Sequence, residues 1–392
     1  MRVLVTDGDS RAALAVTRSL GSAGHVVFVG SHIHRSLAAA SRYCERAIQY
    51  PNPADDVEAF IRSLSQHIEN YDIDVLLPIS DITSLSIAAS EDTFSKQCTL
   101  PFHKGEQLFS AADKAHIVSL CRTLNVPHPE TIIVNNSLQT VELDFDFPIV
   151  IKPTRSRVRV DNKWYSTSVS YAHSKEDLQR QLASLPPHTF PVMLQRRIEG
   201  PGLGVFACAD HGKIIACSSH KRIREKPPSG GVSVVSKSIS VPEETLSYAE
   251  ALLEELDWTG VAMVEFKVAE DTGVPYVMEI NGRFWGSLQL AIDAGVDYPS
   301  ILVSLMAGNT RLPALSDYKT GIHNRWLWGD VDALLLSIFS KREKKRLGDK
   351  HPGLIGAIRD FIESRPNQRF EVLRWSDPLP WIVETRKRLF GR

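Results

Sequence analysis

The chain has 392 residues, which is long for one hydrophobic core and predicts two or three domains. Hydrophobic residues make up 43% and charged residues 23%, a balance typical of soluble globular proteins. The 45 basic and 46 acidic residues leave a formal net charge of −1, so bulk charge gives no support to nucleic-acid binding.

The N-terminal sequence enters a strand pattern directly, without the basic segment and apolar stretch of a secretory signal. No window approaches ~20 uninterrupted apolar residues, so we expect no membrane-spanning helix. None of the five cysteines forms a CxxC pair or a zinc-type cluster with histidine. A cytoplasmic protein without membrane insertion is therefore expected.

Residues 1–112 alternate between strand and helix patterns. Strand-like runs lie at Arg2–Thr6, His25–Val29 and Asp74–Ile79, and helix-like segments run from an Asp9 or Ser10 cap to Leu20 and over Val57–Glu69. This alternation predicts an α/β domain with a Rossmann-like parallel sheet. The turn after the first strand, DGDSR, lacks the GxGxxG spacing, so a dinucleotide site is not expected there.

The next part of the chain mixes short strands with helices. Helical patterns cover Asp113–Leu124, Ser174–Leu185 and Glu243–Leu256. Strand patterns cover Phe147–Lys152, Pro191–Gln195, Val205–Cys208, Lys213–Ser218, Val261–Lys267 and Tyr276–Ile280. Two segments are interpreted as loops, the cationic TRSRVRVDNKWYST and the later HKRIREKPPSGGVS. The last 80 residues read as a helical extension, whose basic run KREKKR is interpreted as a solvated helix face.

The last two predicted strands carry paired polar residues. A tight turn centred on Thr272 places Glu265 opposite Glu279, because both lie seven residues from it. Their Cβ atoms are then about 5 Å apart. Asn281 projects from the same face as Glu279, since side chains alternate along a strand. Opposed carboxylates repel each other unless a cation lies between them, so the hairpin predicts a site for a hard cation.

Magnesium suits this oxygen-rich site, because it takes few protein ligands and completes its shell with water and substrate phosphates. The alternative is that Glu265 and Glu279 pair with arginine or lysine side chains, although their own strands are otherwise apolar. Bound phosphates would in turn need cations. Lys152 ends a buried strand, where a lone ammonium group is costly without an anion, and Lys114 begins a helix, where anions are favoured.

These features resemble the ATP-grasp superfamily, in the family's order, over most of residues 1–312. The matching segments are DK…C…LNVPHPET, FPIVIKP, MLQRRIEG, GVAMVEF and VMEINGRFWGS, and the last two are similar to the carbamoyl-phosphate-synthase and biotin-carboxylase-like branch. The resemblance implies an N-terminal α/β domain and a two-part grasp domain, with a helical extension behind them. The implied boundaries are 1–112, 113–312 and 313–392, with a small lid subdomain at about 125–195 and a large subdomain at 196–312.

The resemblance also implies roles for single residues. Glu265, Glu279 and Asn281 correspond to the ligands of two Mg²⁺ ions that bridge the phosphates of ATP, with Mn²⁺ as a substitute. Arg283 corresponds to the arginine that steadies the acyl-phosphate intermediate and the transferred phosphoryl group. The positions that correspond to nucleotide contacts, or that lie near the expected transfer centre, are Lys114, Lys152, Gln195, Arg196, Arg197, Ile198, Glu199 and Lys226.

The sequence departs from the family pattern in two places. EGPGLG has Pro201 and Gly202 where a ribose-binding carboxylate is usual, which leaves Glu199 as the substitute. The phosphate-covering loop is rich in arginine instead of glycine, so we expect it to cover phosphate with side chains.

The implied activity is that of a ligase, which activates a small carboxylate with ATP and joins it to an amine. Two alternatives remain open: an ATP-grasp enzyme that uses bicarbonate for carboxylation or carbamoyl transfer, and a nucleotide-binding module without catalysis. Homodimers are common in the family. The pattern does not identify the substrates. The pocket that selects them is expected in the N-terminal domain, with Asp81 and its neighbours as candidates, and the C-terminal tail is a further candidate for its wall.

Overall fold

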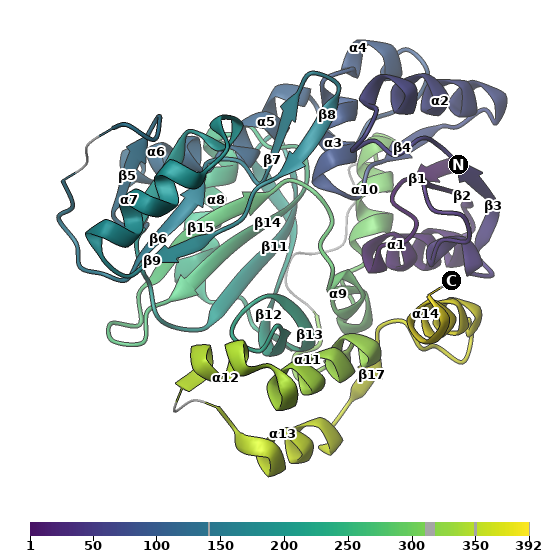
Figure 1. Ribbon diagram of the computed structural model, residues 1–392. Coiled ribbons are helices and arrows are strands. Elements are labelled where there is room, and N and C mark those ends of the chain that lie inside the picture. Colours follow the sequence, from purple (N-terminus) through teal and green to yellow (C-terminus); the bar gives the residue numbers. More distant parts are fainter. Residues whose placement is uncertain (140–141, 310–317, 349–350, 392) are drawn as a thin grey trace.

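The computed structural model describes residues 1–139, 142–309, 318–348 and 351–391. Figure 1 shows the N-terminal domain beside the sheets of the central region, with the C-terminal helices running back so that the last of them lies near the N-terminal domain. Within these described ranges, no helix is long and apolar enough to cross a bilayer.

The N-terminal domain is built on a parallel sheet of order β3-β2-β1-β4, and the α/β class is confirmed. Its strands are β1 (Arg2–Val5), β2 (Val26–Ser31), β3 (Cys44–Gln49) and β4 (Val75–Leu77). Its helices are α1 (Arg11–Ser22), the 3-10 turn η1 (Ala38–Ala40), α2 (Val57–Asn70), α3 (Asp81–Ala88), α4 (Glu91–Phe94) and α5 (Gly105–Ala112). Ser10 caps α1 by accepting a hydrogen bond from the Ala13 amide, which decides between the two predicted caps.

A small antiparallel sheet of order β5-β10-β6-β9 follows helix α6 (Lys114–Thr123). Its strands are β5 (Thr131–Val134), β6 (Ile149–Pro153), β9 (Ser170–Ala172) and β10 (Val192–Arg196), with helix α7 (Lys175–Ser184) and the turn η2 (Pro187–Thr189) between the last two. The arginine-rich segment that we interpreted as a loop is instead a separate hairpin, β7 (Arg157–Val160) and β8 (Lys163–Ser166). Its two-residue turn needs a positive φ, which Asp161 supplies at 54°.

The large sheet has the order β15-β14-β11-β12-β13-β16-β17. Its central strands are β11 (Gly202–Asp210), β12 (Lys213–Lys226), β13 (Val232–Ile239), β14 (Gly260–Val268) and β15 (Pro275–Asn281), with α8 (Glu243–Glu255), α9 (Leu288–Ala294) and α10 (Tyr298–Met306). The sequence interpretation was wrong for β12, which does not end at Ser218. It continues through HKRIREK, because that run pairs with β13 as far as Lys226.

The C-terminal extension is mainly helical, as expected, but it also adds two short strands to the large sheet. These strands are β16 (His323–Arg325), which pairs with β13, and β17 (Gln368–Phe370). The helices are α11 (Leu327–Phe339), α12 (Lys341–Leu347), α13 (Gly353–Ile362) and α14 (Leu379–Phe390). The predicted boundary between residues 312 and 313 lies outside the described residues.

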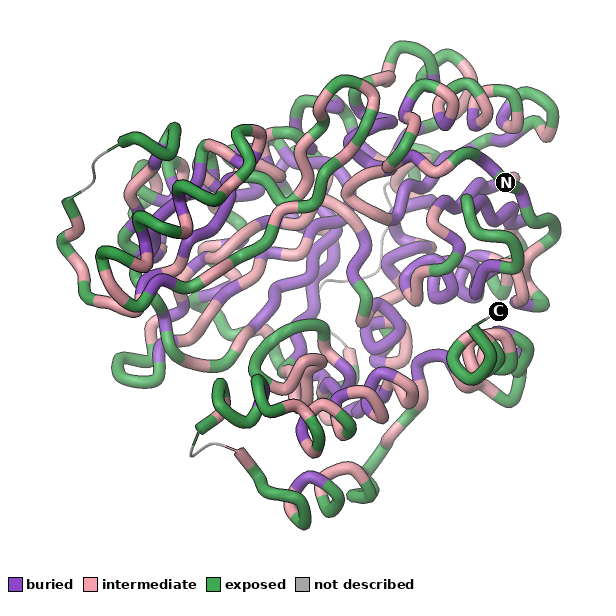
Figure 2. Tube along the Cα trace, viewed as in Figure 1, coloured by how far each residue is buried: buried purple, intermediate pink, exposed green. Residues whose placement is uncertain are grey.

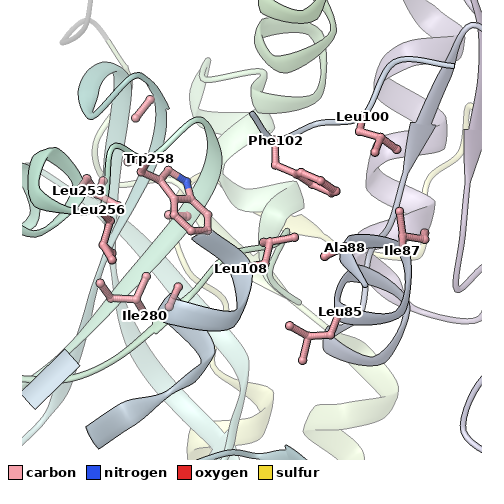
Figure 3. Close-up of a cluster of buried hydrophobic side chains, with 14 of the residues drawn as sticks. Leu85, Ile87, Ala88, Leu100, Phe102, Leu108, Leu253, Leu256, Trp258 and Ile280 are labelled. Carbon is pink, nitrogen blue, oxygen red and sulfur yellow. The ribbon is translucent and has the colours of Figure 1, made fainter. Parts of the chain in front are cut away.

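The hydrophobic core is continuous between the N-terminal domain and the large sheet. Figure 2 shows buried residues running through both regions, and Figure 3 shows Leu85 and Leu108 of the N-terminal domain in one cluster with Trp258 and Ile280. Each buried leucine or isoleucine of such a cluster contributes about 1.5–3 kcal/mol relative to an exposed one. Shared packing of this kind fixes the position of the N-terminal domain relative to β15.

Candidate active site

The hairpin of β14 and β15 places Glu265 directly opposite Glu279, as the sequence predicted. Near the turn, Val268 pairs with Pro275 and Phe266 with Val277, and the register then shifts by one residue before Glu265. Asn281 follows on the same side of the strand, where its amide donates a hydrogen bond of 3.3 Å to Glu279 Oε1. Three oxygen-bearing side chains, Glu265, Glu279 and Asn281, thus gather on this hairpin.

Glu279 is held by two lysines from other elements. Lys152 of β6 lies 3.3 Å and Lys114 of α6 lies 3.7 Å from Glu279 Oε2, measured from each Nζ. Burial disfavours the charged carboxylate, but the two ammonium groups and the hydrogen bond from Asn281 outweigh it and lower the pKa of Glu279 to about 2. The two lysines that the sequence selected therefore meet at one carboxylate, which stays ionised at neutral pH.

Glu265 has a cationic partner that the sequence interpretation missed. Arg222 of β12 donates a 2.8 Å hydrogen bond to Glu265 Oε1 and a 3.0 Å bond to Glu225. Burial, with a further contribution from the nearby Glu279, nevertheless raises the pKa of Glu265. Both carboxylates of the hairpin are therefore paired with basic side chains, as the alternative interpretation proposed, although none of these partners comes from the hairpin itself.

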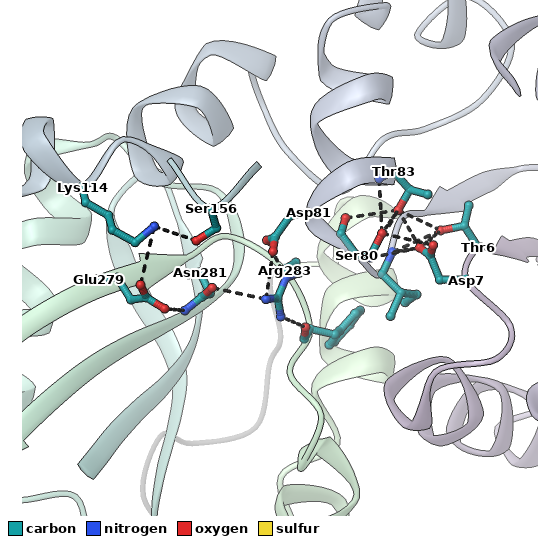
Figure 4. Close-up of polar contacts among 12 residues, drawn as sticks. Thr6, Asp7, Ser80, Asp81, Thr83, Lys114, Ser156, Glu279, Asn281 and Arg283 are labelled. Carbon is teal, nitrogen blue, oxygen red and sulfur yellow. Dashed lines mark hydrogen bonds and ion pairs between the residues drawn. The ribbon is translucent and has the colours of Figure 1, made fainter. Parts of the chain in front are cut away.

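Arg283 lies just beyond β15 and connects the hairpin to the N-terminal domain. Its Nε donates a 2.6 Å hydrogen bond to Asp81 Oδ1, and its Nη2 donates to Asp81 Oδ2 at 3.2 Å and to Asn281 Oδ1 at 3.3 Å. Figure 4 shows this series of contacts running from Lys114 through Glu279 and Asn281 to Arg283 and Asp81. Gly282 is required within it, because a Cβ there would lie 2.3 Å from the buried Trp258 ring.

Asp81 is positioned by a polar network at the carboxyl end of β1. The Asp7 carboxylate accepts hydrogen bonds from the Thr83 hydroxyl at 2.6 Å and from the Ser80 amide at 3.0 Å (Figure 4). Ser80 also caps α3, of which Asp81 is the first residue. The DGDSR turn therefore fixes the start of α3, and through it the carboxylate that holds Arg283.

These residues line a cavity of about 200 Å³, which we call the central cavity. Lys114, Glu279, Asn281 and Arg283 form part of its wall, together with Asp81 and the β7–β8 hairpin. The hairpin is docked on the N-terminal domain, since Trp164 Nε1 donates a 3.0 Å hydrogen bond to Ser86 Oγ. Lys114 Nζ also donates to Ser156 Oγ at 2.7 Å, where the chain enters the hairpin. The cavity is thus covered by arginine-rich chain, and contact of this segment with phosphate stays a prediction.

The other residues selected from the sequence do not line this cavity. Gln195 is buried on β10 and donates to Thr131 Oγ1 at 2.9 Å, and the Ile198 carbonyl accepts a 3.3 Å bond from Lys267 Nζ. Lys226 Nζ donates to Asp332 Oδ2 at 2.6 Å in the C-terminal extension. Arg196 lies near Glu130, with 3.8 Å between its Nε and Glu130 Oε2, and Arg197 pairs with Glu199 at 3.2 Å. Nucleotide contacts by these six residues stay predictions.

The oxygen set fits a magnesium ion that also binds nucleotide phosphate. Glu279 is ionised, and carboxylate and amide oxygens are ligands that Mg²⁺ accepts. The Asn281 amide donates to Glu279 and its oxygen accepts from Arg283, so this oxygen would have to turn toward Glu279 to join a bound ion. The described residues contain no group of three or more His, Cys, Asp or Glu side chains that could hold a metal alone. An ion held by Glu279, Asn281 and Glu265 would therefore take phosphate and water as its remaining ligands, and Glu265 would have to exchange Arg222 for the metal.

The comparison with protein families agrees with this geometry. The profile of a family described as ATP-grasp in the biosynthetic pathway with Ter operon matches residues 188–328, which include the β14–β15 hairpin and Arg283. This segment is thus similar to the ATP-grasp family. The D-alanine–D-alanine ligase of Acetivibrio thermocellus is 25% identical to this chain over 190 residues, which is 44% of the chain and 48% of that ligase. The chain thus matches about half the length of this curated relative.

Solved structures of other proteins share the fold. The biotin carboxylase of Campylobacter jejuni superposes on this chain with a TM-score of 0.65 and 14% identity, over 82% of this chain and 74% of the carboxylase. The L-amino acid ligase of Bacillus licheniformis gives a TM-score of 0.59 and 15% identity, over 79% of this chain and 74% of the ligase. At these identities the likeness shows the fold alone, which extends well beyond the segment matched by the family profile.

Proposed function

We propose that this protein is an ATP-dependent ligase that activates a carboxylate as an acyl phosphate and joins it to an amine. The observation that carries the proposal is the series of contacts from Lys114 and Lys152 through Glu279 and Asn281 to Arg283 and Asp81. Cations that suit phosphate, oxygens that suit Mg²⁺ and an arginine that suits a transferred phosphoryl group follow one another in this series, and all of its members except Lys152 line the central cavity. The fold and the similarity to a D-alanine–D-alanine ligase support the same activity.

The lysines and Glu279 have complementary tasks in this proposal. Lys114 and Lys152 are nearly buried, so their ammonium groups are only partly hydrated and attract the phosphates of ATP strongly. Glu279 would repel those phosphates without a counterion. When Mg²⁺ is bound by Glu279, Asn281 and Glu265, it neutralises the phosphate charge that develops in the reaction. Two ions, with Mn²⁺ as a substitute, are our prediction for the loaded site.

Arg283 is assigned to the reacting groups. A substrate carboxylate oxygen attacks the γ-phosphorus, the bond from that phosphorus to the β–γ bridging oxygen breaks, and ADP leaves. An amine nitrogen then attacks the acyl carbon, loses a proton to the medium, and releases inorganic phosphate as the amide forms. Arg283 is already oriented by Asp81, so its remaining donors can bind the anionic group without losing much conformational freedom. The covering β7–β8 hairpin limits the access of water to the acyl phosphate.

The test measures ADP release from Mg·ATP by the full chain, with pools of small carboxylates and amines added separately and together. We expect release above background only when both pools are present, and we expect Glu279→Gln to abolish it. Glu243→Gln is the matched control, because it makes the same change at an exposed residue of α8.

Three outcomes would contradict the proposed ligase. Release with bicarbonate alone would favour the carboxylase or carbamoyl-type alternative. Tight ATP binding without turnover in any pool would favour a non-catalytic nucleotide-binding module. Undiminished release by Glu279→Gln would refute the assigned metal and phosphate site. Homodimer formation and a cytoplasmic location are further predictions, which other measurements would test.

A further inference from the structure

A second cavity, of about 540 Å³, lies between the N-terminal domain and helix α14. We call it the α14 cavity. Its wall includes Asp9 at the carboxyl end of β1, Ile79 at the carboxyl end of β4, and Glu384 and Lys387 of α14. The volume is in the range of about 300–1,000 Å³ that small-molecule sites have. Figure 1 shows α14, the last helix of the chain, beside this domain.

The position of the α14 cavity in the fold favours a ligand site. In the order β3-β2-β1-β4, the chain moves outward from β1 to one side through β2 and β3, and then crosses to β4 on the other side. The crevice at the carboxyl ends of β1 and β4 is therefore the switch point of this parallel sheet, and open α/β sheets bind ligands at such points. Helix α14 converts the open crevice into a cavity.

The α14 cavity shares three wall residues with the central cavity, namely Asp81, Arg157 and Arg283. A small molecule in the α14 cavity can therefore present one end to Arg283. Helix α14 is held in place from both sides, since Asp9 pairs with Lys387 and the Trp326 indole donates a 2.6 Å hydrogen bond to Glu384 Oε1. Nearby, Arg18 pairs with the buried Asp377 at 2.8 Å, just before the helix.

Most charged side chains on the wall of the α14 cavity form an ion pair with another side chain that the structure describes, and two of them do not. Lys387 pairs with Asp9, Arg283 pairs with Asp81, and Arg11 pairs with the buried Glu371. Glu384 has no ion pair with any residue that the structure describes, and its contact is the neutral Trp326 indole. In the same described ranges Arg157 has no carboxylate partner, and its guanidinium donates only to the Ser166 hydroxyl.

A ligand that carries both a positive and a negative group would complement the unpaired carboxylate and the unpaired guanidinium on this wall. We propose that the α14 cavity binds a small zwitterion of the amino-acid type, with its ammonium group on Glu384 and its carboxylate on Arg157. Because Arg157 also lines the central cavity, the carboxylate end faces Arg283 and the ammonium end faces α14. The ligand is then the carboxylate substrate, a role that rests on the proposed ligase function.

Burial of Glu384 is consistent with this arrangement. Burial, together with the negative charges of Glu371 and Asp9, raises the pKa of the Glu384 carboxyl more than the Trp326 hydrogen bond and the Arg11 charge lower it. An ammonium ligand in contact with Glu384 would offset that cost. The C-terminal extension thereby gains a role in substrate recognition through α14 (Leu379–Phe390), which begins 51 residues after the family match ends at residue 328.

The experiment measures binding to the full chain without turnover. Saturation-transfer NMR is recorded with a mixture of free amino acids, n-alkylamines and simple carboxylates, and each amino acid that binds is then titrated by calorimetry. We expect amino acids to bind and the single-charge compounds to bind at least about tenfold more weakly, the loss typical of a removed charged hydrogen bond. Glu384→Gln, which keeps an acceptor for the Trp326 indole, should weaken amino-acid binding by about the same factor.

Arg386→Gln is the matched control, because Arg386 is exposed on α14 and does not line the cavity. It should bind amino acids like the unaltered chain. The deamino analogue of each bound amino acid should bind the unaltered chain and Glu384→Gln equally. Absence of amino-acid binding, or equal binding by Glu384→Gln at an unchanged unfolding temperature, would overturn the proposal. Since no turnover is required, failure of the ligase assay and failure of this binding test are separate results.

Discussion

Glu279→Gln gives the most informative perturbation, because it removes the anion that two nearly buried lysines share. Lys114 and Lys152 are 6% and 8% exposed, and Glu279 is the carboxylate within 3.7 Å of both ammonium groups. Removing one member of a buried ion pair costs about 3–5 kcal/mol, and the 25% exposure of the Glu279 side chain reduces this to about 2–3 kcal/mol. We expect the nucleotide-free variant to fold but to be less stable by this amount.

The stabilisation of the chain by nucleotide distinguishes the unaltered protein from Glu279→Gln more sharply than stability without nucleotide does. In the unaltered chain, ionised Glu279 opposes the phosphates of ATP until Mg²⁺ is present, so ATP with EDTA should raise the unfolding temperature much less than Mg·ATP. In Glu279→Gln the phosphates replace the missing anion beside Lys114 and Lys152, so ATP with EDTA should stabilise the variant as well as Mg·ATP does. Differential scanning fluorimetry at matched ATP concentrations measures both responses.

The reasoning would be refuted by either of two results. One is a variant that retains the same magnesium dependence of stabilisation as the unaltered chain. The other is a variant whose stability without nucleotide is unchanged, because that would mean the two lysines do not depend on Glu279. Glu243→Gln, at an exposed position, serves as the control for both measurements.

Three further predictions follow from the same structure. Arg283→Lys loses the two-point contact with Asp81, so kcat should fall about 10²–10³-fold with little change in KM for ATP in steady-state assays, and a fall below about threefold would contradict the assigned role. Trp164→Ala removes the bond that docks the β7–β8 hairpin on Ser86, so the ratio of ADP released to amide formed should rise, and an unchanged ratio would exclude the hairpin as a water barrier. Burial lowers the pKa of His220 from 6.5 to about 3, so the unfolded chain binds a proton that the folded chain does not, and stability falls as pH falls through this window. His220→Gln should reduce the slope of unfolding free energy against pH in denaturant titrations by up to about 1.4 kcal/mol per pH unit, and an unchanged slope would contradict the burial of a neutral imidazole.

The sequence was sufficient to predict the hairpin, although for a reason that was only partly right. We counted outward from a turn centred on Thr272, whereas Val268 pairs with Pro275, which centres the turn between Asp271 and Thr272. The register shift before Glu265 then adds one residue to β15 and brings Glu279 opposite Glu265. The prediction succeeded because the bulge compensated for the error in the turn.

Strand β12 was missed because its charges are satisfied by distant parts of the chain. Arg222 pairs with Glu265, and Arg224 pairs with Asp330 of α11. A run as charged as HKRIREK favours a solvated loop when it is considered alone, and its absence of Gly or Pro before Pro227 was the only local sign of a strand. Because β12 was not predicted as far as Lys226, its Arg222 was not predicted as the partner of Glu265.

The α14 cavity lay beyond sequence reasoning for a similar reason. Asp9 and Lys387 are 378 positions apart, and no periodicity in either segment indicates that they meet. By contrast, Lys114, Glu279 and Asn281 were predicted because strand alternation and the ends of secondary-structure elements already restrict where such side chains lie. Arg283 was selected through the resemblance to the ATP-grasp superfamily. Local patterns and the resemblance therefore selected the candidate site residues, and long-range packing defined the space around them.

The central claim, that a carboxylate is activated through an acyl phosphate, is tested most directly by following oxygen. The carboxylate substrate that supports ADP release is labelled with ¹⁸O in its carboxyl group, and the inorganic phosphate formed is analysed by mass spectrometry. The proposed mechanism predicts that one labelled oxygen moves from each carboxylate to phosphate as the amide forms. Phosphate that remains unlabelled while the amide accumulates would contradict it.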